Sequence, residues 1–171
     1  PKRRLYYAKK FVLGAAKNLL RNLKYYQRRG RNLDDSIKEI TSLIRQIDQV
    51  HDVEELMGIE GTIHRRYYAS WQSVFIPDVD FSKRVRRPPD NMVNTLISFL
   101  NGLMYTTCLS EIYVTQLNPT ISYLHSPMDR RFSLCLDISE IFKPMIVDRL
   151  IFSLINKNMI SEEDFNKESN Y

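Results

Sequence analysis

Apolar residues recur every three or four positions along most of the chain, the spacing of one face of an α-helix. The pattern predicts helices over residues 2–29, 33–50, 52–71, 90–117 and 133–156. Asp52 can cap the third of these helices, and Asp90 can open the fourth. The apolar stripe of the first helix comprises Leu5, Ala8, Val12, Ala15, Leu19, Leu23 and Tyr26. Pro144 lies inside the last helix and is expected to kink it, because proline removes a ladder hydrogen bond. Strand patterns are weak throughout, so we predict an all-α domain of about six helices that covers the whole chain, residues 1–171.

One carboxylate interrupts the apolar face of the third predicted helix. Glu60 falls on the face that is otherwise formed by Val53, Leu56, Ile63 and Tyr67. A charge directed into a core is costly unless it is paired or binds a metal. Taken alone, Glu60 is slightly better explained by an ion pair with an arginine of a neighbouring helix, or by a face assignment that is wrong by one residue.

The glycines around Glu60 favour a binding site. Gly58 and Gly61 lie within one helical turn, and each costs about 1 kcal/mol relative to alanine. We therefore expect another backbone, a substrate or a metal to approach closely here.

Two further clusters are candidates for co-ligands of Glu60. Asp137 and Glu140 are three residues apart, so their Cβ atoms are expected about 5–6 Å apart on one helix. Adjacent carboxylates repel each other unless a cation lies between them or one is protonated. The alternative is a pair of solvated acids on an exposed face. His125 lies in the loop predicted over residues 118–131, where a structural role is the simpler explanation for a lone histidine.

A metal centre would need an imidazole as well as these acids. His64 follows Glu60 by four residues, but we expect it on the helix edge that faces Arg65 and Arg66, outside the pocket. Two carboxylates and one imidazole suit Mn²⁺ or Mg²⁺ better than zinc. Such an ion can polarise a phosphodiester and activate an attacking oxygen.

Charge points to an anionic partner. The chain carries 25 Lys and Arg against 20 Asp and Glu, a net charge of +5, which favours nucleic acid. The basic residues of one predicted loop are candidates for phosphate contacts, the alternative being a solvated loop. They are Lys83, Arg84, Arg86 and Arg87.

The hydropathy and the two ends of the chain allow predictions about its cellular location and completeness. There is no signal peptide and no run of about 18 apolar residues, so we predict no membrane span and a cytoplasmic protein. The chain begins without Met and stops in a polar stretch. We expect a fragment of a longer protein.

Four linked motifs resemble one known family. They are Gly58-Ile59-Glu60-Gly61; Arg87-Pro88-Pro89-Asp90 with Asn94; Leu117-Asn118-Pro119 with Leu124-His125; and Leu136 to Pro144 with Asp148. Their order and spacing over residues 5–150 are similar to those of the CRISPR-associated spacer-acquisition endonuclease/integrase (Cas-one family). The resemblance implies its helical catalytic domain, which follows an N-terminal β-domain that is absent here. It also implies that Glu60, His125 and Glu140 bind Mn²⁺ or Mg²⁺, and that Asp137 lines the same catalytic site.

The resemblance also implies an activity and partners. Family members act in antiviral defence by inserting spacer DNA into the repeat array, where a 3′-hydroxyl attacks a phosphodiester. They work as homodimers bridged by a small protein of the Cas-two family. Three residues depart from the pattern: Gln116 and Ser122 replace glycines, and Lys143 replaces a frequent arginine. The alternatives are a non-catalytic helical nucleic-acid-binding module and a transposase built on the same domain.

Overall fold

The computed structural model describes residues 2–125 and 131–165, and within them it confirms the all-α prediction, because they contain helices and no strand. The α-helices are α1 (Lys2–Gln27), α2 (Asp34–Gln46), α3 (Val53–Ala69), α4 (Trp71–Val74), α5 (Met92–Tyr113), α6 (Ser133–Phe142) and α7 (Arg149–Asn156). Short 3₁₀ turns occupy Ile47–Gln49 (η1) and Glu162–Asp164 (η3), and a π-helical turn, η2, occupies Pro144–Asp148. No helix in this part of the chain is long and apolar enough to cross a bilayer.

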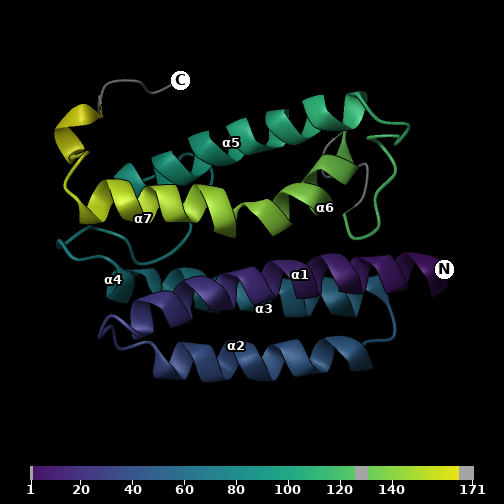
Figure 1. The fold of residues 1–171 in the computed structure, drawn as a ribbon, viewed down its shortest axis with the longest axis horizontal. Coiled ribbons are helices and arrows are strands. Elements are labelled where there is room, and N and C mark those ends of the chain that lie inside the picture. Colours follow the sequence, from purple (N-terminus) through teal and green to yellow (C-terminus); the bar gives the residue numbers. More distant parts are fainter. Residues whose placement is uncertain (1, 126–130, 166–171) are drawn as a thin grey trace.

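Helix α1 joins two groups of helices. It packs against α2 and α3 on one side and against α6 and η2 on the other, as Figure 1 shows. Its buried residues include the predicted stripe Ala8, Val12, Ala15, Leu19 and Leu23 and also Ala16 and Leu20. The wider apolar face follows from contacts on two sides. Helix α1 thereby brings α3, with Glu60, close to α6, with Glu140.

Side-chain caps fix where two helices begin. The Asp52 carboxylate accepts a hydrogen bond from the Glu55 N–H at 2.8 Å and caps α3, as its position in the sequence predicts. Helix α5 is capped one residue after Asp90, which was expected to open it. Asn91 accepts from the Asn94 N–H at 2.9 Å, while Asp90 instead accepts from the Asn94 side chain at 2.8 Å.

The long helix predicted over residues 133–156 is interrupted at Pro144, as expected. Helix α6 ends at Phe142, and the Asp148 N–H donates to the Lys143 carbonyl, five residues back, at 3.0 Å. This is the hydrogen bond of a π-helical turn. The interruption separates α6, which carries the acidic cluster, from α7.

Candidate metal centre

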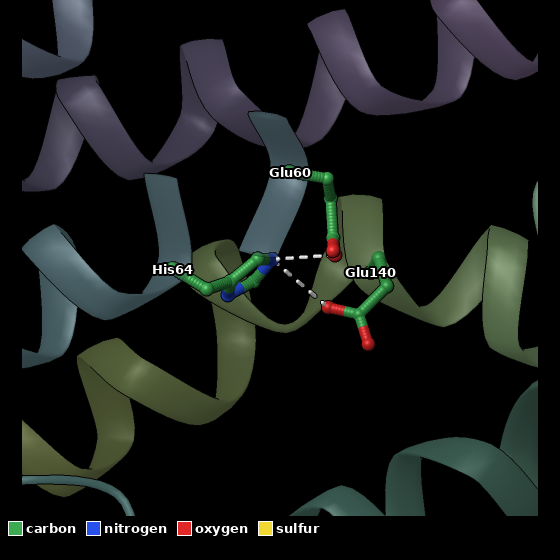
Figure 2. A group of neighbouring side chains, drawn as sticks. All are labelled: Glu60, His64 and Glu140. Carbon is green, nitrogen blue, oxygen red and sulfur yellow. Dashed lines mark ion pairs between the residues drawn. The ribbon is translucent and has the colours of Figure 1, made fainter. Parts of the chain in front are cut away.

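Helices α3 and α6 bring Glu60 and Glu140 together. His64 stands between them, with its Nε2 atom 3.1 Å from Glu60 Oε1 and 3.6 Å from Glu140 Oε2 (Figure 2). One ligand atom from each residue lies within 4.8 Å of the other two. The three side chains are only 18–21% exposed. The two predicted carboxylates thus lie at one partly buried site. We call Glu60, His64 and Glu140 the Glu60 cluster.

The prediction that His64 lies outside the pocket is wrong. Residues i and i+4 are neighbours on a helix face, and His64 follows Glu60 by that spacing on α3. The two arginines after it are exposed instead, and Arg66 pairs with Glu39 of α2 at 3.0 Å. The Glu-x-x-x-His spacing was the sequence signal that could have identified this residue.

Mutual electrostatics hold His64 and Glu140 charged at neutral pH. Burial by itself lowers the pKa of His64, but the hydrogen bond to Glu60 and the charges of both carboxylates raise it to about 9. Burial raises the pKa of Glu140, yet the nearby Lys143 and His64 lower it to about 2. The Lys143 ammonium group pairs with Glu140 Oε1. Glu60 therefore pairs with His64 of its own helix, where an arginine of a neighbouring helix was considered.

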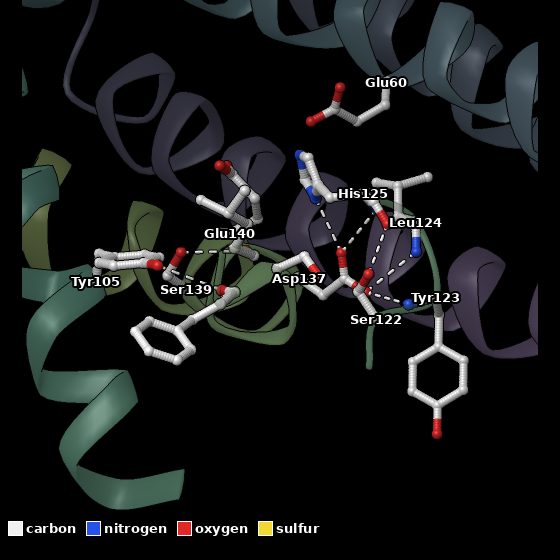
Figure 3. Close-up of polar contacts among 12 residues, drawn as sticks. Glu60, Tyr105, Ser122, Tyr123, Leu124, His125, Asp137, Ser139 and Glu140 are labelled. Carbon is white, nitrogen blue, oxygen red and sulfur yellow. Dashed lines mark hydrogen bonds and ion pairs between the residues drawn. The ribbon is translucent and has the colours of Figure 1, made fainter. Parts of the chain in front are cut away.

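The second cluster is centred on Asp137, whose side chain is fully buried. Its Oδ1 accepts from His125 Nδ1 at 2.8 Å and from the His125 N–H at 3.1 Å. Its Oδ2 accepts from the N–H groups of Tyr123 at 2.6 Å and Leu124 at 3.0 Å (Figure 3). Burial raises the pKa of Asp137, but these donors lower it below its usual value. Asp137 therefore fixes the loop and the orientation of the His125 ring.

His125 lies beside the Glu60 cluster and not within it. Among the described residues, the group of ligand atoms within 4.8 Å comprises Glu60, His64 and Glu140. Figure 3 shows the second nitrogen of the His125 ring on the side of Glu60 and Glu140, away from Asp137. A cavity of about 10 Å³ separates the clusters; Glu60, Asp137 and Glu140 line it together with Leu124 and apolar side chains of α1. Such a space holds about one water-sized particle.

Two departures from the family pattern make contacts at this site. The Ser122 hydroxyl donates to the His125 carbonyl at 2.5 Å, within the loop that Asp137 holds. Lys143 provides the ammonium group beside Glu140. Both residues thus support the loop or the charges of the cluster.

Within the part of the chain that the structure describes, no other backbone closely approaches Gly58 or Gly61. Gly58 and Gly61 are exposed on α3, and a Cβ atom at either position would meet no neighbouring atom within 4 Å. They face away from the Glu60 cluster, so no close approach within this domain explains them.

The four cations of the predicted basic loop, Lys83 to Arg87, have two different environments: one is bound to α5, and three are exposed. The Arg84 guanidinium donates to Asn94 Oδ1 at 3.0 Å and to Ser98 Oγ at 2.9 Å on α5, and burial lowers its pKa. Arg84, predicted to contact nucleic acid, is thus engaged within the protein. The other predicted contacts are exposed, namely Lys83, Arg86 and Arg87.

The whole chain, residues 1–171, matches the family model of CRISPR associated protein Cas1. The chain belongs to the Cas1 family. It is 55% identical over 169 residues to the CRISPR-associated endonuclease Cas1 of Fusobacterium nucleatum, covering 99% of this chain and 50% of that relative. The chain thus spans about half the length of the curated Cas1 relatives it matches.

Solved structures of this fold agree with the Cas1 assignment. A Cas1 protein from Thermotoga maritima matches with a TM-score of 0.87 and 42% identity, over 98% of this chain and 52% of that one. A casposase bound to its integration product matches with a TM-score of 0.81 and 28% identity, over 99% of this chain and 48% of that one.

Proposed function

We propose that this chain is the catalytic domain of a metal-dependent DNA endonuclease/integrase that inserts spacer DNA during CRISPR adaptation. The observation that carries the proposal is the meeting of Glu60 and Glu140, from separate helices, beside an imidazole that a buried carboxylate orients. Membership of the Cas1 family supports it, as does the name endonuclease carried by the relative at 55% identity. A non-catalytic binding module would have no need of this convergence.

Glu60, His125 and Glu140 are the proposed metal ligands, and Mn²⁺ or Mg²⁺ fits the residues present. Carboxylate oxygens and one imidazole are ligands that Mn²⁺ accepts, and carboxylates suit Mg²⁺. Asp137 holds Nδ1 of His125 in the carboxylate–histidine arrangement common at metal sites. When bound, the ion supplies stabilisation of negative charge on the attacked phosphate.

The remaining residues position the substrate and the ligands. Lys143 favours the ionised form of Glu140 through its adjacent positive charge. The exposed Lys83, Arg86 and Arg87 hold the DNA backbone near the centre, which gives affinity without sequence preference. The attacking group is the 3′-hydroxyl of a spacer fragment, and the phosphodiester it attacks belongs to the repeat array. The full-length protein acts as a homodimer with a Cas2-family partner.

The transposase alternative draws support from the casposase bound to its integration product, which shares the fold at 28% identity. The higher identity to the endonuclease of Fusobacterium nucleatum favours the CRISPR role.

The test is Mn²⁺-dependent DNA cleavage and integration by the full-length protein. We expect Glu60→Ala to lower the rate by about 100-fold or more, the range found when a group that stabilises transition-state charge is removed. Glu54→Ala, at an exposed position of the same helix, is the matched control and should keep the rate. Undiminished cleavage by Glu60→Ala would show that the catalytic assignment is wrong.

A melting experiment separates the enzyme from the binding module. Mn²⁺ should raise the melting temperature, and Glu140→Ala should abolish that rise. Intact DNA binding without any rise would favour the binding module.

A further inference from the structure

His64 is the member of the Glu60 cluster that the family motifs do not supply. We propose that His64 is an additional metal ligand, whose Nε2 proton is released to solvent when the ion binds, and that its nitrogen makes this centre select Mn²⁺ over Mg²⁺. The inference rests on the proposed metal site and concerns which ion that site prefers.

The geometry fits one octahedral ion. Metal–ligand bonds of about 2.1 Å place neighbouring ligand atoms of an octahedral site about 3.0 Å apart. Nε2 of His64 is 3.1 Å from Glu60 Oε1 and 3.6 Å from Glu140 Oε2. The two distances from His64 Nε2 are therefore close to the spacing of adjacent ligands, and one ligand atom from each of the three residues lies within 4.8 Å of the other two.

The surrounding contacts direct the same atoms to the centre. Glu60 and His64 are one turn apart on α3, so the helix backbone fixes their separation. Glu140 divides its oxygens: Oε1 pairs with Lys143, while Oε2 faces His64. Figure 2 shows the His64 ring directed at both carboxylates. Glu140 Oε2 and His64 Nε2 thus form one edge of the site.

A nitrogen ligand affects the two ions differently. Mg²⁺ prefers oxygen ligands and retains bound water, whereas imidazole binds first-row transition ions more strongly. His64 adds a nitrogen beside that of His125, which favours Mn²⁺.

A different role for His64 predicts the opposite result. If its imidazolium served only as counter-ion to Glu60 and Glu140, it would compete with every incoming cation. Its removal would then tighten the binding of Mn²⁺ and Mg²⁺ alike.

The experiment titrates the full-length protein with MnCl₂ and, separately, MgCl₂ by calorimetry. His64→Ala and His64→Gln should raise the Kd for Mn²⁺ about tenfold to a hundredfold, as found when groups around metal sites are removed. The Kd for Mg²⁺ should change by less than about twofold, because Mg²⁺ gains little from nitrogen. His51→Ala removes an exposed imidazole just before α3 and should change neither constant.

A second measurement counts the nitrogen ligands directly. Pulsed electron paramagnetic resonance of the Mn²⁺-loaded, unsubstituted protein should detect two coupled imidazole nitrogens, from His64 and His125. If only one coupled nitrogen were detected, and it were still present in His64→Gln, the inference would be overturned. Tighter or unchanged binding of both ions in the His64 variants would also overturn it. An equal loss of affinity for Mn²⁺ and Mg²⁺ would do the same.

Failure of the proposed metal site itself would look different. In that case Mn²⁺ would not bind the unsubstituted protein, or Glu60→Gln would leave its Kd unchanged.

Discussion

Two buried aspartates show how strongly the environment shifts the pKa of a carboxyl group in this fold. Asp137 is buried and accepts four hydrogen bonds, and its pKa falls. Asp148 is buried as well, but among the described residues its carboxyl accepts a single hydrogen bond, from the Tyr67 hydroxyl at 3.0 Å. Burial therefore dominates and raises the pKa of Asp148 to about 7, against the lowering effects of Tyr67 and His64. The number of donors decides which carboxyl is ionised.

The raised pKa of Asp148 predicts a pH dependence of stability. An unfolded aspartate titrates near pH 3.9, so between about pH 4 and 7 the folded protein keeps a proton that the unfolded chain releases. The free energy of unfolding should fall as pH rises through this window, by on the order of 4 kcal/mol, and should level off above pH 7.

Asp148→Asn should remove this fall, because the amide keeps an acceptor for Tyr67 and does not titrate. Melting temperatures from pH 5 to 8 measure the slope. Asp80→Asn, at an exposed position, should keep it. An unchanged slope in Asp148→Asn would contradict the assignment.

At the scale of helices, Asn22 connects α1 to η2 and α7, the second part of the interrupted helix. Its side-chain NH₂ donates to the Pro144 carbonyl at 2.7 Å and to the Tyr67 hydroxyl at 3.1 Å, and its Oδ1 accepts from Arg149 Nε at 2.9 Å. The residue is 2% exposed. One amide thus links α1, α3, η2 and α7 beside the candidate metal centre.

Asn22→Ala should lower the free energy of unfolding by about 2–4 kcal/mol, because it leaves several buried polar groups without a partner. Urea denaturation measures the loss. Asn32→Ala, in an exposed turn, should change stability by no more than about 0.5 kcal/mol. Equal effects of the two substitutions would mean that the network contributes little.

At the scale of the whole molecule, the net positive charge and the exposed cations of the basic loop bear on DNA binding. The net charge is +5, and three of the four cations of the basic loop are exposed. The buried Asn94 holds that loop on α5 by accepting from Arg84 and from the Val85 N–H. Anchoring and DNA contact are therefore assigned to different residues of one segment.

Combined Arg86→Ala and Arg87→Ala should weaken DNA binding and leave the melting temperature unchanged. Each lost phosphate contact lowers the slope of log K against log salt concentration by about 0.9, or about 2 for the pair. Arg84→Ala should instead lower the melting temperature. Binding isotherms of full-length protein at several salt concentrations provide the measurement, and an unaltered slope in the double variant would rule out contact by these arginines.

The sequence by itself determined the helices and the residue types of the site. Apolar periodicity predicted the all-α class. The missing N–H of Pro144 predicted the break, and the carboxylate of Asp52 predicted the cap, because both act on the adjacent backbone. Periodicity also singled out Glu60, because a charge within an apolar face is visible in one chain.

Only the tertiary structure decided what these residues face. Periodicity gives the face of a helix but not its rotation against a partner, so it misplaced His64 and could not show that Gly58 and Gly61 face outward. The four hydrogen bonds to Asp137 and the internal role of Arg84 depend on segments distant in the sequence. The packing of α1 between α3 and α6 placed Glu60, His64 and Glu140 at one point.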